Sequence, residues 1–179
     1  SSDLDVVVYG DAAILRRGAE LLGLDPGLEG LKIVDCALLS ADDHRPGRVD
    51  AAAGAAAREY VLRATRDAVA GRVAAVVTMP MNKEATQLSD PTFVGHTELI
   101  AAECGVSRFS MMLVSGDLAV THVSTHVSLA EAISRVRTER VREVIDVTHA
   151  TLARFLEHPR IARSEEHTSE LQSRFGISY

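Results

Sequence analysis

The sequence has few of the residues that stabilise very small domains. Its 179 residues include no Trp, only 4% aromatic residues and two cysteines, Cys36 and Cys104. The cysteines form no CxxC motif, which argues against a disulfide framework or a cysteine-rich zinc site. We expect both to be buried thiols in a reducing cytosol. With so few aromatic residues, Val, Ala, Leu and Ile must fill the core.

Positive charge and long apolar runs are scarce as well. There are 19 Lys and Arg against 25 Asp and Glu, which gives a net charge of −6, and no basic stripe is visible. A nucleic-acid partner is therefore not expected. No apolar run reaches the roughly 20 residues of a membrane-spanning helix, and no signal peptide is visible. We expect a cytoplasmic protein with no membrane partner, and 46% hydrophobic residues suffice for one globular domain.

The hydrophobic pattern predicts strands that alternate with helices, which is typical of a layered α/β fold. The first strand begins almost at residue 1, from which we expect that sequence is missing upstream. Strands are predicted at Leu4–Tyr9, Leu31–Leu39, Val73–Val77, Phe109–Val114 and Leu118–Thr125, the last two as a hairpin around Ser115-Gly116-Asp117. Helices are predicted at Ala12–Leu22, Asp50–Ala70 and Thr138–Phe155, with a short one after a Ser128-x-x-Glu131 capping box and a loop at Asp42–Val49.

The stretch Thr78–Glu98 is where we expect a ligand. It follows the run Val73–Val77, whose valines and alanines are typical of a buried strand. Two polar clusters come next, Asn82-Lys83-Glu84 and Gly95-His96-Thr97-Glu98, the second at the expected start of a helix. Open α/β sheets bind ligands where their strands end. The free N–H groups at the start of a helix also attract anions.

Two histidines, His122 and His126, have the spacing of a zinc pair. A helical HxxxH would place both imidazoles on one face, within reach of one ion. The surrounding residues are β-branched or small, which favours a strand. On a strand, residues four apart are separated by roughly 13 Å, too far for one metal with bonds of about 2 Å. We therefore prefer His126, expected at the strand's end, as a metal ligand, and expect His122, mid-strand, to be packed or hydrogen-bonded.

Two further residues have a functional and a bland interpretation. His96 follows Gly95, which lets a backbone approach a ligand closely, but it is equally a loop histidine near a helix cap. Lys83 is either a surface lysine or a cation for a phosphate or carboxylate group. The remaining histidines support no functional argument, and they are His44, His149, His158 and His167.

The segment Arg163–Tyr179 differs in character from the rest of the chain. It has no amphipathic period, and RSEEHTSELQS followed by ISY resembles the translation of a common sequencing-library adapter. We expect residues 1–162 to form a partial α/β domain and residues 163–179 to be a non-native, disordered tail. The alternative is a natural polar terminus. If the tail is non-native, neither His167 nor Glu170 is a site candidate. Sequencing the source DNA across codon 163 would decide between the two explanations of the tail.

Four motifs taken together resemble one family in their order and spacing. The resemblance is to the PdxA family, 4-hydroxythreonine-4-phosphate dehydrogenase, and it covers roughly residues 4–162. It implies a three-layer α/β/α fold like that of isocitrate and isopropylmalate dehydrogenases, and a homodimer with its active site between subdomains and subunits. The motifs are Thr78-x-Pro80-x-Asn82-Lys83-Glu84, Gly95-His96-Thr97-Glu98, Met111-Met112-Leu113 and Thr125-His126-x-x-Leu129, and Gly10-Asp11 also fits.

The resemblance also implies a reaction. It is the NAD-dependent oxidation of a hydroxyl group in a phosphorylated hydroxy acid, followed by loss of carbon dioxide, in pyridoxal phosphate biosynthesis. His96 and Thr97 match the family's substrate-binding His-Thr, and Lys83 is expected to contact the substrate as well. His126 matches the first of three histidines that hold a divalent metal (Zn, Mg or Co), which would act as a Lewis acid. No catalytic or NAD-binding residue is assigned.

The chain departs from the family pattern in two places. The family's opening Gly-Asp-Pro-Ala-Gly-Ile-Gly-Pro stretch is absent. The other two metal histidines, most cofactor contacts and several phosphate contacts would lie beyond Pro159–Ala162, where the adapter-like tail follows. We therefore expect the 179-residue polypeptide to hold the metal weakly and to be an inactive fragment.

Other functions stay open. The residues Val77–Glu84 and Phe93-Val94 suggest a branch distinct from the vitamin B6 enzymes, with threonate or erythronate 4-phosphate as the substrate. A metal-dependent phosphatase or hydrolase would use His96, His126 and a nearby carboxylate. A non-catalytic α/β interaction domain would have these two imidazoles pointing apart.

Overall fold

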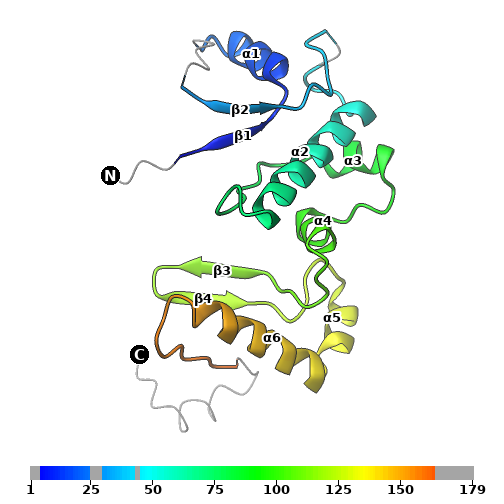
Figure 1. Cartoon of the computed structure of the whole chain (residues 1–179). Coiled ribbons are helices and arrows are strands. Elements are labelled where there is room, and N and C mark those ends of the chain that lie inside the picture. Colours follow the sequence, from blue (N-terminus) through cyan, green and yellow to red (C-terminus); the bar gives the residue numbers. More distant parts are fainter. Residues whose placement is uncertain (1–4, 25–29, 43–44, 164–179) are drawn as a thin grey trace. The chain divides into compact units, whose positions relative to one another are not determined.

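The computed structural model describes residues 5–24, 30–42 and 45–163. The chain divides into two compact units, Ser1–Ser107 and Arg108–Tyr179 (Figure 1). Each unit combines helices with strands, which confirms the predicted α/β class. Within the described ranges, no helix has both the length and the apolar character needed to cross a membrane.

The first unit begins with a β–α–β element. Strands β1 (Val7–Gly10) and β2 (Lys32–Asp35) pair in parallel, and helix α1 (Ala12–Leu21) lies between them in sequence. The helix ends just before Gly23, which adopts φ +64° in the left-handed region that favours glycine. These elements confirm the predicted strands and helix. Both strands are shorter than predicted, and the expected first strand residue, Leu4, lies outside the described residues.

Helix α2 (Ala51–Val69) is the central element of the first unit. It contacts β1 and the two short helices that follow it in sequence, which are described below. The helix begins where the Asp50 carboxylate accepts a hydrogen bond from the Ala53 N–H at 2.9 Å. It ends before Gly71, which has φ +73°. The prediction of a helix from Asp50 to Ala70 is thus confirmed by both of its end signals.

Helix α3 (Lys83–Ser89) packs directly against α2. A Cβ on Gly54 of α2 would lie 2.1 Å from the carbonyl oxygen of Ala85 and 2.5 Å from the amide nitrogen of Thr86, so the two backbones touch there. The polar segment around Lys83 is thus helical, which the sequence pattern did not reveal. A signal was present, because the side chain of Asn82 accepts a hydrogen bond from Ala85 N at 2.9 Å and caps the helix.

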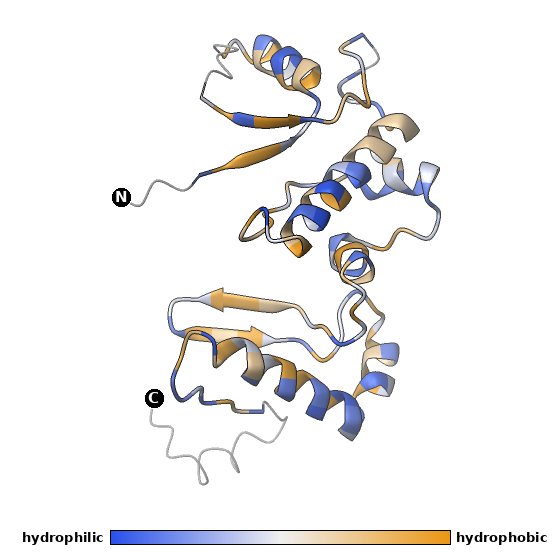
Figure 2. Cartoon of the chain, viewed as in Figure 1, coloured by the Kyte–Doolittle hydropathy of each residue, from blue (hydrophilic) through white to orange (hydrophobic). Residues whose placement is uncertain are grey.

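The predicted buried strand Val73–Val77 is wrong. These residues belong to no helix or strand. Val77 is 90% exposed, and Met79, just after the run, is 77% exposed. A valine-rich run forms a strand only where another strand pairs with it. Among the described residues, the sheet of this unit contains β1 and β2 alone. Hydrophobic residues also predominate in the four strands that the described residues form (Figure 2).

The core of the first unit is built mainly from small residues. Cys36 is buried there, as predicted, but Cys104 is exposed, so the prediction of two buried thiols is wrong for the second one. Cys104 caps the end of a helix, where the side chain meets solvent. The other buried apolar residues of this unit are Ala12, Ala56, Leu62, Ala64, Ala85, Phe93 and Ala101.

The second unit begins with an antiparallel hairpin of β3 (Met112–Ser115) and β4 (Leu118–Thr121). This confirms the predicted hairpin, and Gly116 in its turn has φ +55°. Helix α5 (Leu129–Arg135) follows, and the Ser128 hydroxyl accepts a hydrogen bond from its third residue, Glu131, at 3.3 Å. The predicted helix start is confirmed.

Helix α6 (Thr138–Leu152) completes the described part of the second unit. It buries Val144 and Thr148 and ends before the predicted last residue, Phe155, which is 78% exposed. Its Arg140 guanidinium donates hydrogen bonds to the carbonyl oxygens of Val123 and Phe109, at 3.1 and 3.0 Å. These bonds tie the helix to the segments that flank the hairpin. Except for Arg163, the predicted tail lies outside the described residues.

Candidate functional site

Helix α4 (His96–Glu103) begins where the sequence predicted and carries two of the predicted site residues, His96 and Thr97, in its first turn. Its N-cap is Gly95, whose backbone is extended, with φ 174° and ψ −179°. Any residue can adopt this conformation, so the backbone does not require glycine here. The absence of a side chain instead leaves space, since a Cβ on Gly95 would lie 3.2 Å from Glu98 Oε2 and 4.0 Å from Lys83 Nζ.

The structure therefore brings Lys83, the first residue of α3, close to the start of α4. Its ammonium group and the Glu98 carboxylate approach the same point above the bare Cα of Gly95. The predicted substrate contacts Lys83, His96 and Thr97 thus lie around one polar cluster within the first unit. Their binding role stays a prediction. Glu98 is the member that the sequence did not single out, although its place three residues after the N-cap was visible.

Two buried polar atoms in this cluster have no partner. His96 Nε2 and Glu98 Oε2 are both shielded from solvent, and neither makes a hydrogen bond with the described residues. Burying a polar or charged atom without a partner costs free energy, and native proteins rarely do so. These two atoms therefore indicate where a ligand or a water molecule would complete the hydrogen bonding.

The predicted metal ligand, His126, belongs to the second unit. It lies between β4 and α5, is exposed, and adopts φ +58° in the left-handed region. Strand β4 ends at Thr121, so the predictions of His126 at a strand's end and His122 within a strand are wrong. Regular pairing stops because β3 begins at Met112, and only the bond from His122 N to Met111 O, 3.0 Å, continues it.

The expected hydrogen bonding of His122 is confirmed, since its Nδ1 lies 3.3 Å from the Met111 carbonyl oxygen. Of the two histidines His122 and His126, we therefore keep only His126 as a predicted metal ligand. The described residues include no group of three or more His, Cys, Asp or Glu side chains that could hold an ion. They do not form a metal site by themselves, so no step of a reaction is assigned here to a metal. That His126 faces His96 stays a prediction.

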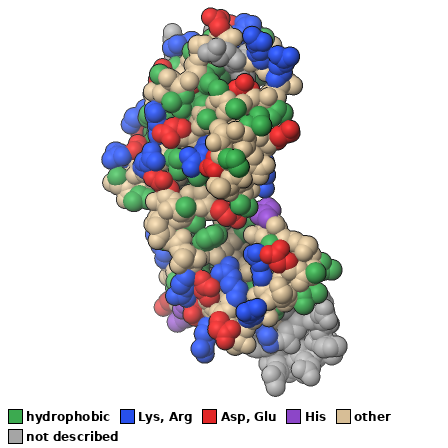
Figure 3. Space-filling model, turned by 90° about the vertical axis from the view of Figure 1, so that its right-hand side faces the viewer, with side chains coloured by type: hydrophobic (Ala, Val, Ile, Leu, Met, Phe, Trp, Pro, Cys, Tyr) green, Lys and Arg blue, Asp and Glu red, His purple; other side chains and the backbone are tan. Residues whose placement is uncertain are grey.

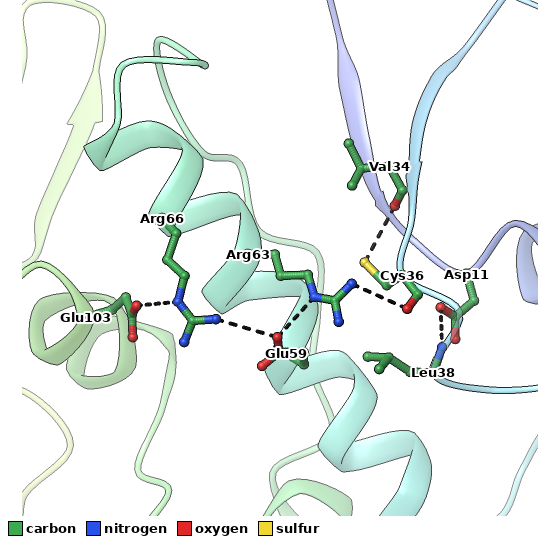
Figure 4. Close-up of polar contacts among 8 residues, drawn as sticks. All are labelled: Asp11, Val34, Cys36, Leu38, Glu59, Arg63, Arg66 and Glu103. Carbon is green, nitrogen blue, oxygen red and sulfur yellow. Dashed lines mark hydrogen bonds and ion pairs between the residues drawn. The ribbon is translucent and has the colours of Figure 1, made fainter.

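A second polar cluster surrounds Asp11, directly after β1 (Figure 4). Its carboxylate is only 2% exposed. It accepts hydrogen bonds from the N–H groups of Leu38 and Leu39, at 3.0 and 2.6 Å, and from the Tyr60 hydroxyl at 2.7 Å. Both oxygens are thus satisfied, so this carboxylate holds the segment after β2 against α2 and is not a candidate for ligand binding. Its partners were not visible in the sequence.

Ion pairs along α2 connect elements of the first unit (Figure 4). Arg63 donates to the Cys36 carbonyl oxygen at 3.3 Å and pairs with Glu59 at 3.0 Å. Arg66 pairs with Glu59 at 3.6 Å and with Glu103 of α4 at 2.6 Å. On the face shown in Figure 3, acidic and basic side chains lie next to one another and form no large patch of one charge. Such exposed pairs contribute little stability each.

The environment of Cys36 does not make its thiol reactive. Burial raises the pKa of the Cys36 thiol, against a smaller opposing effect of the neighbouring Arg63. A thiol with a raised pKa is protonated at neutral pH and is a poor nucleophile. Cys36 therefore packs as a small apolar residue.

Tyr9 provides a pH-dependent contact between β1 and α2. Its hydroxyl donates to the Asp67 carboxylate at 2.6 Å. Burial, reinforced by this hydrogen bond, raises the pKa of Tyr9 from 10.0 to about 12. The folded state favours the neutral phenol, so the stabilisation is fully present below pH 10 and is lost as the pH rises towards the folded pKa.

We expect the difference between the tyrosinate absorbance of the wild type and of Tyr9→Phe to develop near pH 12 in the folded protein, because Tyr9 ionises only there. The same difference measured in concentrated urea should develop near the ordinary value of 10.0. An equal midpoint in both conditions would contradict the role of Tyr9.

The fold is that of solved dehydrogenases. The chain matches the structure of 4-hydroxythreonine-4-phosphate dehydrogenase from Klebsiella pneumoniae with a TM-score of 0.83 and 33% identity, over 96% of this chain and 58% of that one. The enzyme of the same name from Burkholderia phymatum gives a TM-score of 0.78 and 32% identity, over 99% and 58%. The chain thus shares the α/β fold of this class of dehydrogenases.

Sequence similarity defines the group within this class. The family model of the pyridoxal phosphate biosynthetic protein PdxA matches residues 2–163, so the chain belongs to the PdxA family, as its motifs had indicated. D-threonate 4-phosphate dehydrogenase from Bordetella bronchiseptica is 37% identical over 153 residues, 78% of this chain and 44% of the relative. Its namesake from Pectobacterium atrosepticum is 36% identical over 160 residues, 89% and 48%. The chain spans about half the length of the curated relatives it matches.

Proposed function

We propose that the whole protein is an NAD-dependent dehydrogenase that oxidises a hydroxyl group of a phosphorylated four-carbon hydroxy acid. The observation that carries the proposal is the family match over residues 2–163, which includes the polar cluster around Gly95. Relatives from Bordetella and Pectobacterium are named for D-threonate 4-phosphate. We therefore place this substrate ahead of 4-hydroxythreonine 4-phosphate, after which the structural neighbours are named.

The chemistry of this substrate suits the groups at the start of α4. The Lys83 ammonium is a cation for the phosphate or the carboxylate. The N–H groups of the first turn, which includes Thr97, favour an anion as well. His96 Nε2 is a partner for a hydroxyl group, because it is otherwise unbonded. Transfer of a hydride from the carbon β to the carboxylate to NAD, with loss of the proton of the hydroxyl group on that carbon, gives a β-keto acid, which then loses carbon dioxide.

A homodimer and a divalent metal (Zn, Mg or Co) complete the proposal and rest on the family resemblance. His126 would be one ligand of that metal, and the other ligands would have to come from polypeptide outside the described residues. No contact to NAD is assigned to a residue of this chain. A role in pyridoxal phosphate biosynthesis belongs to the 4-hydroxythreonine 4-phosphate alternative, and threonate or erythronate 4-phosphate would be substrates of sugar-acid catabolism.

The test is NADH formation by the protein expressed from the source gene, once that gene has been read across codon 163. We expect D-threonate 4-phosphate to give the highest kcat/KM among the threonate, erythronate and 4-hydroxythreonine phosphates. Lys83→Met should lower kcat/KM by about 10- to 100-fold, because a hydrogen bond to a charged group contributes roughly 1.5–3 kcal/mol. The 179-residue chain alone should form no NADH. Release of inorganic phosphate without NADH would contradict the proposal and indicate a phosphatase.

A further inference from the structure

Glu98 occupies a position that no role described so far explains. Its Oε2 atom is buried and unbonded, and no ion pair of Glu98 occurs among the described residues. The Lys83 ammonium nevertheless lies nearby, since both groups come within 4.0 Å of the point where a Cβ on Gly95 would sit. A cation and an anion thus lie at one place, and one buried oxygen of the anion has no hydrogen-bond partner.

Stabilisation of helix α4 accounts for only part of this arrangement. A negative charge in the first turn of a helix is favourable, and Glu98 is the acidic residue of that turn. A capping box would go further and have the carboxylate accept a hydrogen bond from the N–H of Gly95, the N-cap. Glu98 Oε2 makes no such bond. The helix therefore explains the charge of Glu98 but not its buried, unbonded oxygen.

Gly95 supports a ligand at this place independently. Its extended backbone is open to any residue, so the missing Cβ matters here only through the space that it leaves. The space that the missing Cβ leaves lies beside Glu98 Oε2, at 3.2 Å from the Cβ position. A bare Cα next to two charged groups is the arrangement that lets a small molecule approach the backbone.

We propose that Glu98 is a specificity-determining residue of the substrate site. Its carboxylate accepts a hydrogen bond from a substrate hydroxyl that is not oxidised, while Lys83 binds the adjacent anionic group. An ionised carboxylate only accepts hydrogen bonds, and it repels phosphate and carboxylate groups, so a hydroxyl is the part of a phosphorylated hydroxy acid that fits it. This inference rests on the proposed function and deepens it by assigning the recognition of the hydroxyl α to the carboxylate.

The test compares three ligands by NMR titration of the 179-residue chain, with the amide signals of Gly95 and His96 as reporters. The ligands are D-threonate 4-phosphate, its 2-deoxy analogue and inorganic phosphate. We expect the wild type to prefer D-threonate 4-phosphate over the analogue by about tenfold, since charge-assisted hydrogen bonds are roughly twice as strong as neutral ones. Glu98→Gln should lose most of this preference and bind inorganic phosphate at least as well as the wild type.

Two further variants separate recognition from folding. Glu84→Gln removes the same charge from the exposed first turn of α3, next to Lys83, and should keep the tenfold preference. Gly95→Ala should fold normally, because alanine can adopt the extended backbone and the flexible end of the Glu98 side chain can move aside. The new methyl group fills the space beside Glu98 Oε2, so this variant should lose D-threonate 4-phosphate binding.

A preference for the hydroxylated ligand that survives in Glu98→Gln would overturn the inference and leave the proposed function intact. An equal loss of all three ligands in that variant would also overturn it, because Glu98 would then act on Lys83 or on the fold. Failure of the wild type to bind D-threonate 4-phosphate at all would overturn the inference, because the cluster of Lys83, Gly95 and Glu98 would then not recognise the substrate. The proposed function of the whole protein is tested separately, by NADH formation.

Discussion

Gly54→Ala is expected to lower the free energy of unfolding by about 3 kcal/mol, the upper end of the usual range for overpacking. The added methyl group would lie 2.1 Å from the Ala85 carbonyl oxygen and 2.2 Å from its carbonyl carbon. Backbone atoms cannot rotate away as the end of a side chain can. Helices α2 and α3 would have to move apart. The start of α3, which is capped by Asn82 and carries Lys83, would be displaced as well. Urea unfolding followed by circular dichroism measures the change.

Gly18→Ala is the matched control in α1. Nothing lies within 4 Å of a Cβ on Gly18, which is also inside a helix. Alanine there should stabilise the protein by about 0.5–1 kcal/mol, since glycine is a poor helix former. Equal effects of the two substitutions would show that the contact between α2 and α3 does not have the closeness described.

Asp11→Ala is expected to cost about 3 kcal/mol of unfolding free energy. The substitution leaves the N–H groups of Leu38 and Leu39 and the Tyr60 hydroxyl without their acceptor. Each buried group left unsatisfied costs roughly 1–3 kcal/mol, and water entering the cavity would recover part of the sum. Chemical denaturation of the variant at neutral pH gives the value.

Two control variants divide this effect. Tyr60→Phe removes one of the three hydrogen bonds and should cost about 1 kcal/mol. Asp35→Ala removes an exposed carboxylate that also accepts two backbone hydrogen bonds, from Ala12 and Ala37, both at 3.2 Å. Water can replace that carboxylate, so its loss should cost less than about 1 kcal/mol. If Asp35→Ala were as damaging as Asp11→Ala, burial would not be the cause.

Helix ends were predictable from the sequence because their signals are local. Asp50 and Ser128 cap the helices that follow them, and Gly23 and Gly71 end the helices that precede them, each through contacts within a few residues. The run Val73–Val77 failed for the opposite reason. A strand exists only through a neighbour that is distant in sequence, and the composition of the run does not contain that information.

In the candidate site, too, the features set by nearby residues were predictable from the sequence and those set by distant contacts were not. The position of His96 at the start of a helix followed from the Gly-His-Thr-Glu motif, and the helix forms there. Which side chain lacks a partner does not follow from a motif, so Glu98 emerged only from the structure. The left-handed backbone of His126 was equally invisible, since no spacing rule predicts a positive φ at a single histidine. The partners of Asp11 lie up to 49 residues away.

The largely exposed run from Val73 to Met79 also affects how this polypeptide behaves when concentrated. It consists of seven uncharged residues without Pro or Gly, three of them valines, and such segments readily pair with copies of themselves in cross-β aggregates. Pro80 follows at once and cannot donate a backbone hydrogen bond, which limits the length of any intermolecular ladder. The residues that lead towards the candidate site thus also form a segment prone to aggregation.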